Sequence, residues 1–159
     1  MSSLKEAAKV FLAQKRIAVA GVSRQGDIPA NLIYKKLRDT GHEVYSVNPN
    51  AETIDGDVCY PDLPAIPVTI DGVVIATHPQ KTCAIVQSCA DAGIKRVWIH
   101  RAFGQGSVDE TALNLCRKLG LSVIPGSCPM MFCEPVDIAH KCMRWFFSVS
   151  GKQAEPEHY

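Results

Sequence analysis

Short apolar runs alternate with helical patterns along most of this chain. Five runs of four to six residues are rich in Val, Ile and Ala, and Gly, Pro or polar residues bound them, which predicts β-strands. The predicted strands are Arg16–Ala20, Glu43–Val47, Asp71–Ala76, Arg96–Ile99 and Leu121–Ile124.

Helical periodicity fills the intervals between these runs. Pro29 suits a first helical turn and Gly41 suits the residue after a helix, so Pro29–Thr40 is predicted to be helical. Ser107 and Glu110 form the pattern S-x-x-E, which predicts a capping box that opens a helix to Leu119. The other expected helices are an amphipathic one within residues 1–14, Pro79–Ala92, and one within residues 135–150 that packs on the same domain. The polar segment Ser148–Tyr159, which includes the tail 151–159, is expected to fray.

Strands that alternate with helices favour the α/β class. We expect a single domain with a Rossmann-like, doubly wound, parallel five-stranded sheet in a three-layer α/β/α arrangement. Right-handed crossovers make 3-2-1-4-5 the natural order of the five strands. The segment Asp55–Pro67 holds three prolines and is interpreted as an extended connection with one short strand or turn.

Composition excludes several classes of protein. The net charge is +1, so no basic surface argues for nucleic acid. No apolar run approaches the roughly 20 residues that span a bilayer, and residues 1–16 lack the apolar core of a signal peptide, so a cytoplasmic protein is expected. Seven cysteines without a C-x-x-C pair argue against a disulfide framework. The group Cys128, Cys133, His140 and Cys142 leaves open a thiol or metal protein.

The first strand ends in a glycine turn, Gly21-Val-Ser-Arg-Gln-Gly26. Ligands of such sheets bind outside the carboxyl ends of the strands, where this turn lies. Gly21 allows a tight turn, and Gly26 is expected to allow close approach at the helix start, whose amides favour an anion. The Ser23 hydroxyl and the Arg24 guanidinium add donors for a phosphate.

The second strand argues against a nicotinamide dinucleotide. Such a site needs an acidic residue at the end of this strand for the ribose hydroxyls, but the chain has Asn48-Pro49-Asn50 there and no carboxylate before Glu52. Asn48, Asn50 and Arg24 better suit an adenine nucleotide with a phosphate near the ribose. An NAD(P)-binding oxidoreductase or redox sensor remains an alternative, although the chain lacks the acidic residue that would recognise the ribose hydroxyls.

Four segments together carry a family resemblance: "KRIAVAGVSR", "YSVNPNAETIDGDVCYPDLPAI", "DGVVIATHPQ" and "KRVWIHRAFG". From Lys15 to Glu134 the chain resembles the CoA-binding domain family, small proteins related to the N-terminal domain of the succinyl-CoA synthetase alpha subunit and of ADP-forming acyl-CoA synthetases. The resemblance implies a Rossmann-like domain over residues 15–134 that binds coenzyme A or an acyl-CoA. The resemblance implies, by position, that the CoA phosphates are held by Gly21, Val22, Ser23 and Arg24. The adenosine 3′-phosphate would be flanked by Asn48, Pro49 and Asn50. The wall against adenine and pantetheine would consist of Thr77, His78 and Pro79.

The chain also departs from its relatives. The synthetases usually place a lysine where Asn50 stands, and Lys81 is the residue that would compensate. Their phosphorylated histidine belongs to a second domain, so the expected function is binding without catalysis, as a homodimer or with a partner enzyme. His100 is expected in a solvated loop of the binding edge; with Arg101 it is the candidate base and anion clamp of an enzyme. Cys128 is either a packed thiol or a partner for the CoA thiol in a mixed disulfide.

Overall fold

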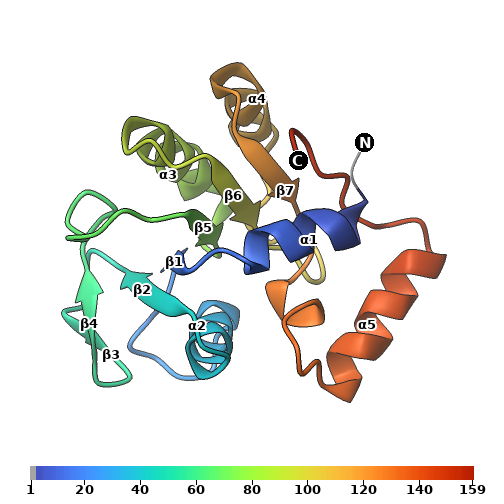
Figure 1. The fold of residues 1–159 in the computed structure, drawn as a ribbon, viewed down its shortest axis with the longest axis horizontal. Helices are drawn as coiled ribbons and strands as arrows, with labels where there is room; N and C mark the ends of the chain where they lie inside the picture. The colour runs from blue at the N-terminus through green and yellow to red at the C-terminus, as the bar shows by residue number, and fades with distance from the viewer. Residues whose placement is uncertain (1–2) are drawn as a thin grey trace.

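The computed structural model describes residues 3–159, in which strands and helices alternate (Figure 1). The elements are α1 Leu4–Leu12, β1 Arg16–Ala20, α2 Pro29–Asp39, β2 Glu43–Val47, β3 Thr53–Ile54, β4 Asp57–Tyr60, β5 Gly72–Ile75, α3 Pro79–Asp91, β6 Arg96–Ile99, α4 Glu110–Leu119, β7 Ser122–Pro125, the 3-10 turn η1 Pro129–Met131 and α5 Ile138–Val149. No helix in this range is long and apolar enough to cross a membrane.

The sheet has seven strands in the order β3-β4-β2-β1-β5-β6-β7, and only the β3–β4 pairing is antiparallel among the described strands. The Rossmann-like α/β class is confirmed, but the count of five strands is wrong. The predicted order is wrong too, because the strand after residue 71 pairs with β1 rather than beyond β2. Asp57–Tyr60, inside the proline-rich connection, takes that outer place and completes the order 3-2-1-4-5-6 of its fold class.

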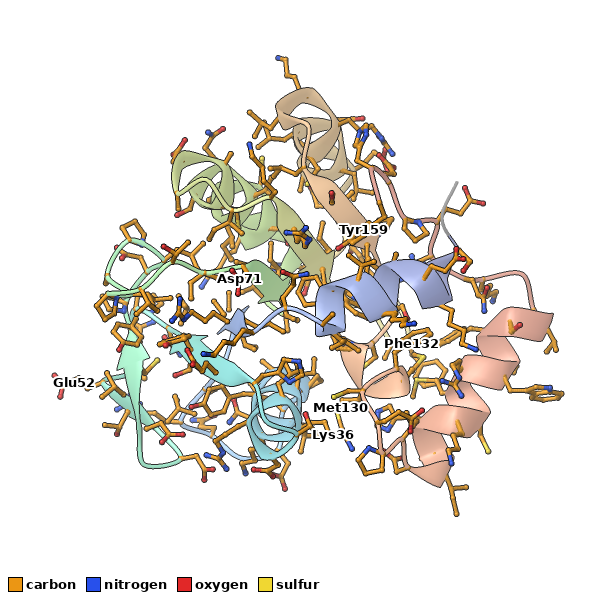
Figure 2. The ribbon with its side chains drawn as sticks, in the orientation of Figure 1. Lys36, Glu52, Asp71, Met130, Phe132 and Tyr159 are labelled. Atoms are coloured by element: carbon orange, nitrogen blue, oxygen red, sulfur yellow. The ribbon has the colours of Figure 1, made fainter. Side chains whose placement is uncertain are left out.

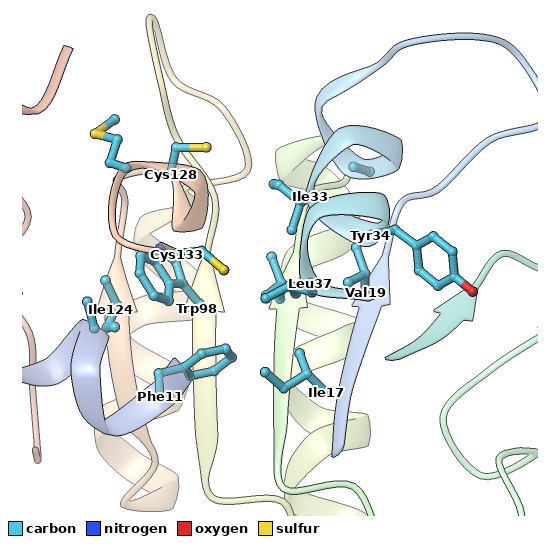
Figure 3. Close-up of a cluster of buried hydrophobic side chains, with 14 of the residues drawn as sticks. Phe11, Ile17, Val19, Ile33, Tyr34, Leu37, Trp98, Ile124, Cys128 and Cys133 are labelled. Atoms are coloured by element: carbon cyan, nitrogen blue, oxygen red, sulfur yellow. The ribbon is translucent and has the colours of Figure 1, made fainter. Parts of the chain in front are cut away.

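Helices cover both faces of the sheet, which explains why its inner strands are apolar throughout. On one face α1, α2 and η1 enclose a cluster around Phe11, Trp98 and Ile124 (Figure 3). On the other face α3 and α4 pack over Val73, Ile75 and neighbouring strands. A strand buried on two faces needs a continuous apolar run, and β1, β5 and β6 have one.

The start of α4 differs from the predicted capping box. Asp109 is the N-cap, and its carboxylate accepts a hydrogen bond from the amide of Ala112 at 2.9 Å. Ser107 is buried instead, and its hydroxyl donates to the carbonyl of Thr77 at 2.6 Å. The predicted Ser107 capping box is therefore wrong, because the Ser107 hydroxyl is used in the bond to Thr77 and Asp109 caps the helix.

The C-terminal tail is held by β7, so the expectation that it frays is wrong. Glu157 pairs with Val123 through two backbone hydrogen bonds of 2.9 and 3.0 Å. The Arg117 guanidinium donates to both carboxylate oxygens of Glu157 at 2.8 Å, and Tyr159 lies beside β7 (Figure 2). In contrast α5 buries no residue fully, and Trp145 is 67% exposed. The end of the chain is therefore anchored better than the helix before it.

Replacing Glu157 by Gln should lower the free energy of unfolding by a small but measurable amount, because the bidentate guanidinium–carboxylate contact loses its charge at a solvent-screened site. Urea unfolding at neutral pH measures this difference. Glu155→Gln is the matched control, since Glu155 is exposed and has no ion pair among residues 3–159. Equal effects of the two variants would show that the tail is not held through Arg117.

Candidate functional site

A cavity of about 690 Å³ lies at the carboxyl edge of the sheet, within the usual size of a small-ligand site. It occupies the point where the strand order reverses, between β1 and β5. Its walls come from the ends of β1, β2 and β5, the loop after β4 and the first turns of α3. The lining residues are Ala20, Gly21, Val22, Ser23, Val47, Asn48, Pro49, Asn50, Pro61, Asp62, Leu63, Ala76, Thr77, His78, Gln80, Lys81, Ala84, Ile85 and Ser88.

The cavity brings together most of the residues proposed from the sequence. Those in its lining are Gly21, Val22, Ser23, Asn48, Pro49, Asn50, Thr77, His78 and Lys81. Three others do not line it. Arg24 is exposed on the loop beyond Ser23, Pro79 begins α3, and His100 is buried at the end of β6.

Gly21 is required by a close contact between two strand ends. Its φ is +106°, and a β-carbon there would overlap the carbonyl oxygen of Ala76, at the end of β5. Gly26 has a φ of +59° with no atom near its missing side chain, so it permits a turn rather than the close approach expected from the sequence. Gly21 is therefore needed for the close approach of two strand ends, whereas Gly26 is needed only for the positive φ of its turn.

Asn31 shapes the loop after β1, and sequence reasoning missed it. This α2 residue is only 5% exposed; its amide nitrogen donates to the carbonyls of Ser23 and Gly26 at 2.7 and 2.9 Å. Its amide oxygen accepts from the backbone N–H of Ser23 at 2.8 Å. A polar residue among the apolar positions of a helix is the signal that could have identified it.

Ser23 is left with one free donor toward the cavity. Its backbone N–H is used by Asn31, and its hydroxyl oxygen accepts a hydrogen bond from the amide of Gln25 at 3.1 Å. The hydroxyl proton has no acceptor within the described residues. A phosphate oxygen in the cavity could therefore accept from the Ser23 hydroxyl.

Asn48 joins the two phosphate-side loops. Its amide nitrogen donates to the carbonyl of Val22 at 2.6 Å, and its amide oxygen accepts from the backbone N–H of Asn50 at 2.7 Å. These bonds fix the Asn48-Pro49-Asn50 turn against the Gly21 turn. The Asn48 side chain thus holds the wall of the cavity, and the exposed Asn50 side chain remains available to a ligand.

The N-terminus of α3 faces the same cavity through His78, Gln80 and Lys81. His78 is the N-cap, and its ring Nδ1 accepts from the amide of Gln80 at 3.4 Å. A helix N-terminus carries partial positive charge, to which Lys81 adds a full charge. This anion-favouring end belongs to α3, whereas the sequence pointed to the start of α2.

The loop after β4 supplies Pro61, Asp62 and Leu63, which the sequence-derived site omitted. A network fixes this strand to α2: the Tyr34 hydroxyl donates to Asp57 at 2.7 Å, and Arg38 donates to the same carboxylate at 3.0 Å. Hydrogen bonds from both donors lower the pKa of Asp57. The motif Tyr60-Pro-Asp-Leu63, already part of the family resemblance, was the available signal.

Thr77 offers an unused polar group at the cavity wall. Its carbonyl accepts from Ser107, but its own hydroxyl is buried with no hydrogen-bond partner in residues 3–159. An unpaired buried hydroxyl costs free energy, so a nearby ligand atom that pairs with it would gain binding energy. This is a local sign that the wall is built to meet a polar ligand.

Of the residues that kept enzymatic readings open, His100 and Cys128 are buried, Arg101 is half-buried, and none of the three lines this cavity. His100 is 7% exposed, so a solvated loop histidine is the wrong description; burial lowers its pKa to about 4. Burial also raises the pKa of Cys128 to about 11, which disfavours the reactive thiolate. The Cys128, Cys133, His140 and Cys142 hypothesis lacks support, since no group of three metal-binding side chains occurs over the described residues.

Gly21→Ala should lower the free energy of unfolding by about 3 kcal/mol or more, because the added β-carbon meets the backbone of Ala76. Gly26→Ala is the matched control with a positive φ and open space, and should cost about 1 kcal/mol. Chemical denaturation compares the two. Losses of the same size would mean that the β1–β5 approach is not a constraint.

The buried His100 predicts a pH dependence of stability. Its folded pKa of about 4 lies below the unfolded value near 6.5, so the unfolded chain binds more protons between them. Stability should therefore be complete above pH 6.5 and fall by roughly 3 kcal/mol toward pH 4. His100→Gln should flatten the slope between pH 6.5 and 5, measured by urea unfolding; an unchanged slope would contradict this assignment.

The family model described as "CoA binding domain" matches residues 15–134. An ADP-forming acetate–CoA ligase of Archaeoglobus fulgidus is 30% identical over 117 residues, which are 69% of this chain and 17% of the ligase. The uncharacterized protein YneT of Bacillus subtilis is 26% identical over 77% of this chain and 88% of its own length. The chain thus spans about a sixth of the ligase but most of the small relative.

Solved structures agree. A hypothetical protein from Pyrococcus horikoshii superposes with a TM-score of 0.77 at 29% identity, covering 85% of this chain and 93% of the other. The dinucleotide-forming acetyl-coenzyme A synthetase 1 of Ca. Korarchaeum cryptofilum gives a TM-score of 0.62 at 26% identity, covering 73% of this chain and 26% of the synthetase. With a family model that matches more than half of its length, this chain belongs to the CoA-binding domain family.

Proposed function

We propose that this protein binds coenzyme A or an acyl-CoA in the cavity between β1 and β5, without a catalytic step of its own. The observation that supports this most is the composition of that cavity. It gathers the Ser23 hydroxyl, the Asn48-Pro49-Asn50 turn and the α3 N-terminus in one space, in a chain of the CoA-binding domain family. Coenzyme A offers several phosphates and an adenine, which need such donors together with an apolar wall.

The phosphates would interact with the donors on one side of the cavity. Ser23 has a free hydroxyl proton, Lys81 contributes an ammonium group, and α3 adds its positive end. Arg24 is exposed next to Ser23 but is not part of the lining, and we propose that it contacts a phosphate at the cavity mouth. In this proposal Lys81 replaces the phosphate-binding lysine that the synthetases usually have at the position of Asn50.

The adenine and the pantetheine arm would contact the apolar part of the lining. Leu63 and Ile85 face this space from the β4 loop and from α3, and Val47 and Ala76 close it from the sheet. A planar ring between aliphatic side chains is removed from water, which contributes to binding in proportion to the apolar area buried. Thr77 supplies a buried hydroxyl without a hydrogen-bond partner in residues 3–159.

The proposal assigns no catalysis because the candidate groups are poorly placed for it. His100 and Cys128 are buried, and neither lines the cavity. The relatives that are named as ligases extend far beyond the segment matched here. We infer that the bound CoA derivative is either sensed by this domain or presented to a partner enzyme.

Isothermal titration calorimetry should detect binding of CoA and about tenfold weaker binding of dephospho-CoA, because one phosphate contact is lost. Lys81→Gln should weaken CoA binding by about tenfold. Lys95→Gln is the matched control, since it removes the same charge just before β6, at the opposite edge of the sheet.

The same titration decides between ligand classes. Absence of heat with both CoA and dephospho-CoA would refute the proposal, and tighter binding of NAD⁺ than of CoA would favour the dinucleotide alternative. Equal affinity of the protein for CoA and dephospho-CoA would show that the protein makes no energetically important contact with the 3′-phosphate. An effect of Lys95→Gln as large as that of Lys81→Gln would indicate unspecific attraction of anions.

A further inference from the structure

A second cavity, of about 560 Å³, opens at the carboxyl ends of β6 and β7. It lies on the sheet face covered by α1 and η1, whereas the first cavity lies on the face covered by α3. Its walls come from the loop after β6, the turn after β7, α5 and the segment after α5. Neither the family resemblance nor the proposed CoA contacts give this cavity a role.

Three cations line this second cavity, and no carboxylate does: Arg101, Arg144 and Lys152. Arg144 donates to the carbonyl of Met131 at 3.0 Å and lies over the ring of Phe132, 5.7 Å from its centroid. None of the three forms an ion pair with an acidic group in the part of the chain that the structure describes. Their positive charge is therefore left for an external anion.

Arg101 is held in position by backbone. Its own N–H donates to the carbonyl of Ser127 at 2.9 Å, which joins the β6 loop to the β7 turn. Its guanidinium lies over Gly126, where a β-carbon would stand 3.3 Å from Nε and from Nη2. A side chain would crowd the guanidinium at this point, so the glycine leaves the room that Arg101 uses.

Ser127 has a strained backbone, and its hydroxyl donates only to a weak sulfur acceptor. It has a φ of +69°, one of three non-glycine residues with positive φ in residues 3–159, and it lines the cavity. The hydroxyl has only a long contact of 3.9 Å to the sulfur of Met131. Strain of this kind persists where the surrounding structure requires it and is enriched at ligand sites.

Aromatic side chains form the rest of the wall. Phe103 and Phe147 are 5.5 Å apart by ring centroids, and Phe146 and Phe147 are 5.8 Å apart. Phe103 is 69% exposed and Phe146 48% exposed, although both line the cavity. Exposed phenylalanines beside a hollow are typical of a surface that an apolar group covers.

We infer that this second cavity binds an organic anion with an apolar body. Its carboxylate would lie among Arg101, Arg144 and Lys152, and its hydrocarbon or aromatic part would pack on Phe103, Phe146 and Phe147. The forked guanidinium of Arg101 suits a carboxylate, and the aromatic wall excludes small inorganic anions as the preferred ligand. This assignment explains both the unpaired cations and the exposed rings.

Two sources share this chemistry: a free carboxylic acid, and the acyl group of a CoA thioester that ends in a carboxylate. The second source rests on the proposed function. It is sterically reasonable because the loop after β6 connects the cavities, with Ser107 donating to Thr77 of the first one. Along the sheet edge β1 and β7 are three strand spacings apart, or about 14 Å, and because the cavities lie on opposite faces the pantetheine arm would also pass over this edge.

The test uses the full chain and two pairs of probes in calorimetry. Phenylacetate should bind, and uncharged phenylacetamide should bind at least tenfold more weakly. If the natural ligand is instead a CoA thioester whose acyl group ends in a carboxylate, glutaryl-CoA should bind more tightly than butyryl-CoA. Arg101→Gln and Lys152→Gln should each weaken the charged probe by about tenfold. Lys152 is exposed, so its variant tests the site even if Arg101→Gln fails to fold.

Lys118→Gln is the control, because Lys118 is an exposed cation of α4 outside both cavities. If Lys152→Gln abolishes the preference for phenylacetate over phenylacetamide, the ligand is a free carboxylic acid. If it abolishes the preference for glutaryl-CoA over butyryl-CoA, the ligand is the carboxylate-terminated acyl group of a CoA thioester. No charge preference in either pair, or an equal loss in Lys118→Gln, would overturn the inference. Because phenylacetate needs no CoA, failure of the CoA proposal and failure of this one are distinguishable.

Discussion

The contact between the backbone of Gly21 and that of Ala76 is the constraint on which the binding edge depends. Gly21 directly follows β1 and Ala76 directly follows β5, and these two strands are neighbours at the centre of the sheet. A side chain at residue 21 would separate them. With the strand ends this close, the chain after β1 turns toward α2 and the chain after β5 turns toward α3, and the space between the two turns is the first cavity.

Two asparagines make this edge rigid, and this changes which atoms remain for a ligand. Asn31 uses its whole amide on the loop after β1, and Asn48 uses its amide to join that loop to the turn after β2. Asn48 lines the cavity and Asn31 supports the loop behind it, and because both amides are used internally, ligand recognition is left to other groups. Those are the Ser23 hydroxyl, the end of α3 with Lys81, and the exposed Asn50.

The sequence predicted the elements well where burial is periodic and poorly where tertiary contacts decide. β1, β2 and β6 have the predicted bounds because each is a short apolar or alternating run between turn residues. A short strand or turn was expected within Asp55–Pro67, but not that Asp57–Tyr60 joins the main sheet as β4, which is held to α2 by Tyr34 and Arg38. The same reason explains the wrong strand order, because a missing strand shifts every assignment beyond it.

The site was predictable only in part for a related reason. Local motifs identified the Gly21 turn and the Asn48 turn, because turn chemistry depends on neighbouring residues. The contribution of α3 depends on how a helix crosses the sheet, and the burial of His100 depends on the folding back of the Gly106 loop over it. Neither leaves a mark in sequence spacing. The Ser107–Thr77 bond ties the loop after β6 to the end of β5, and the same loop supplies Arg101 to the second cavity.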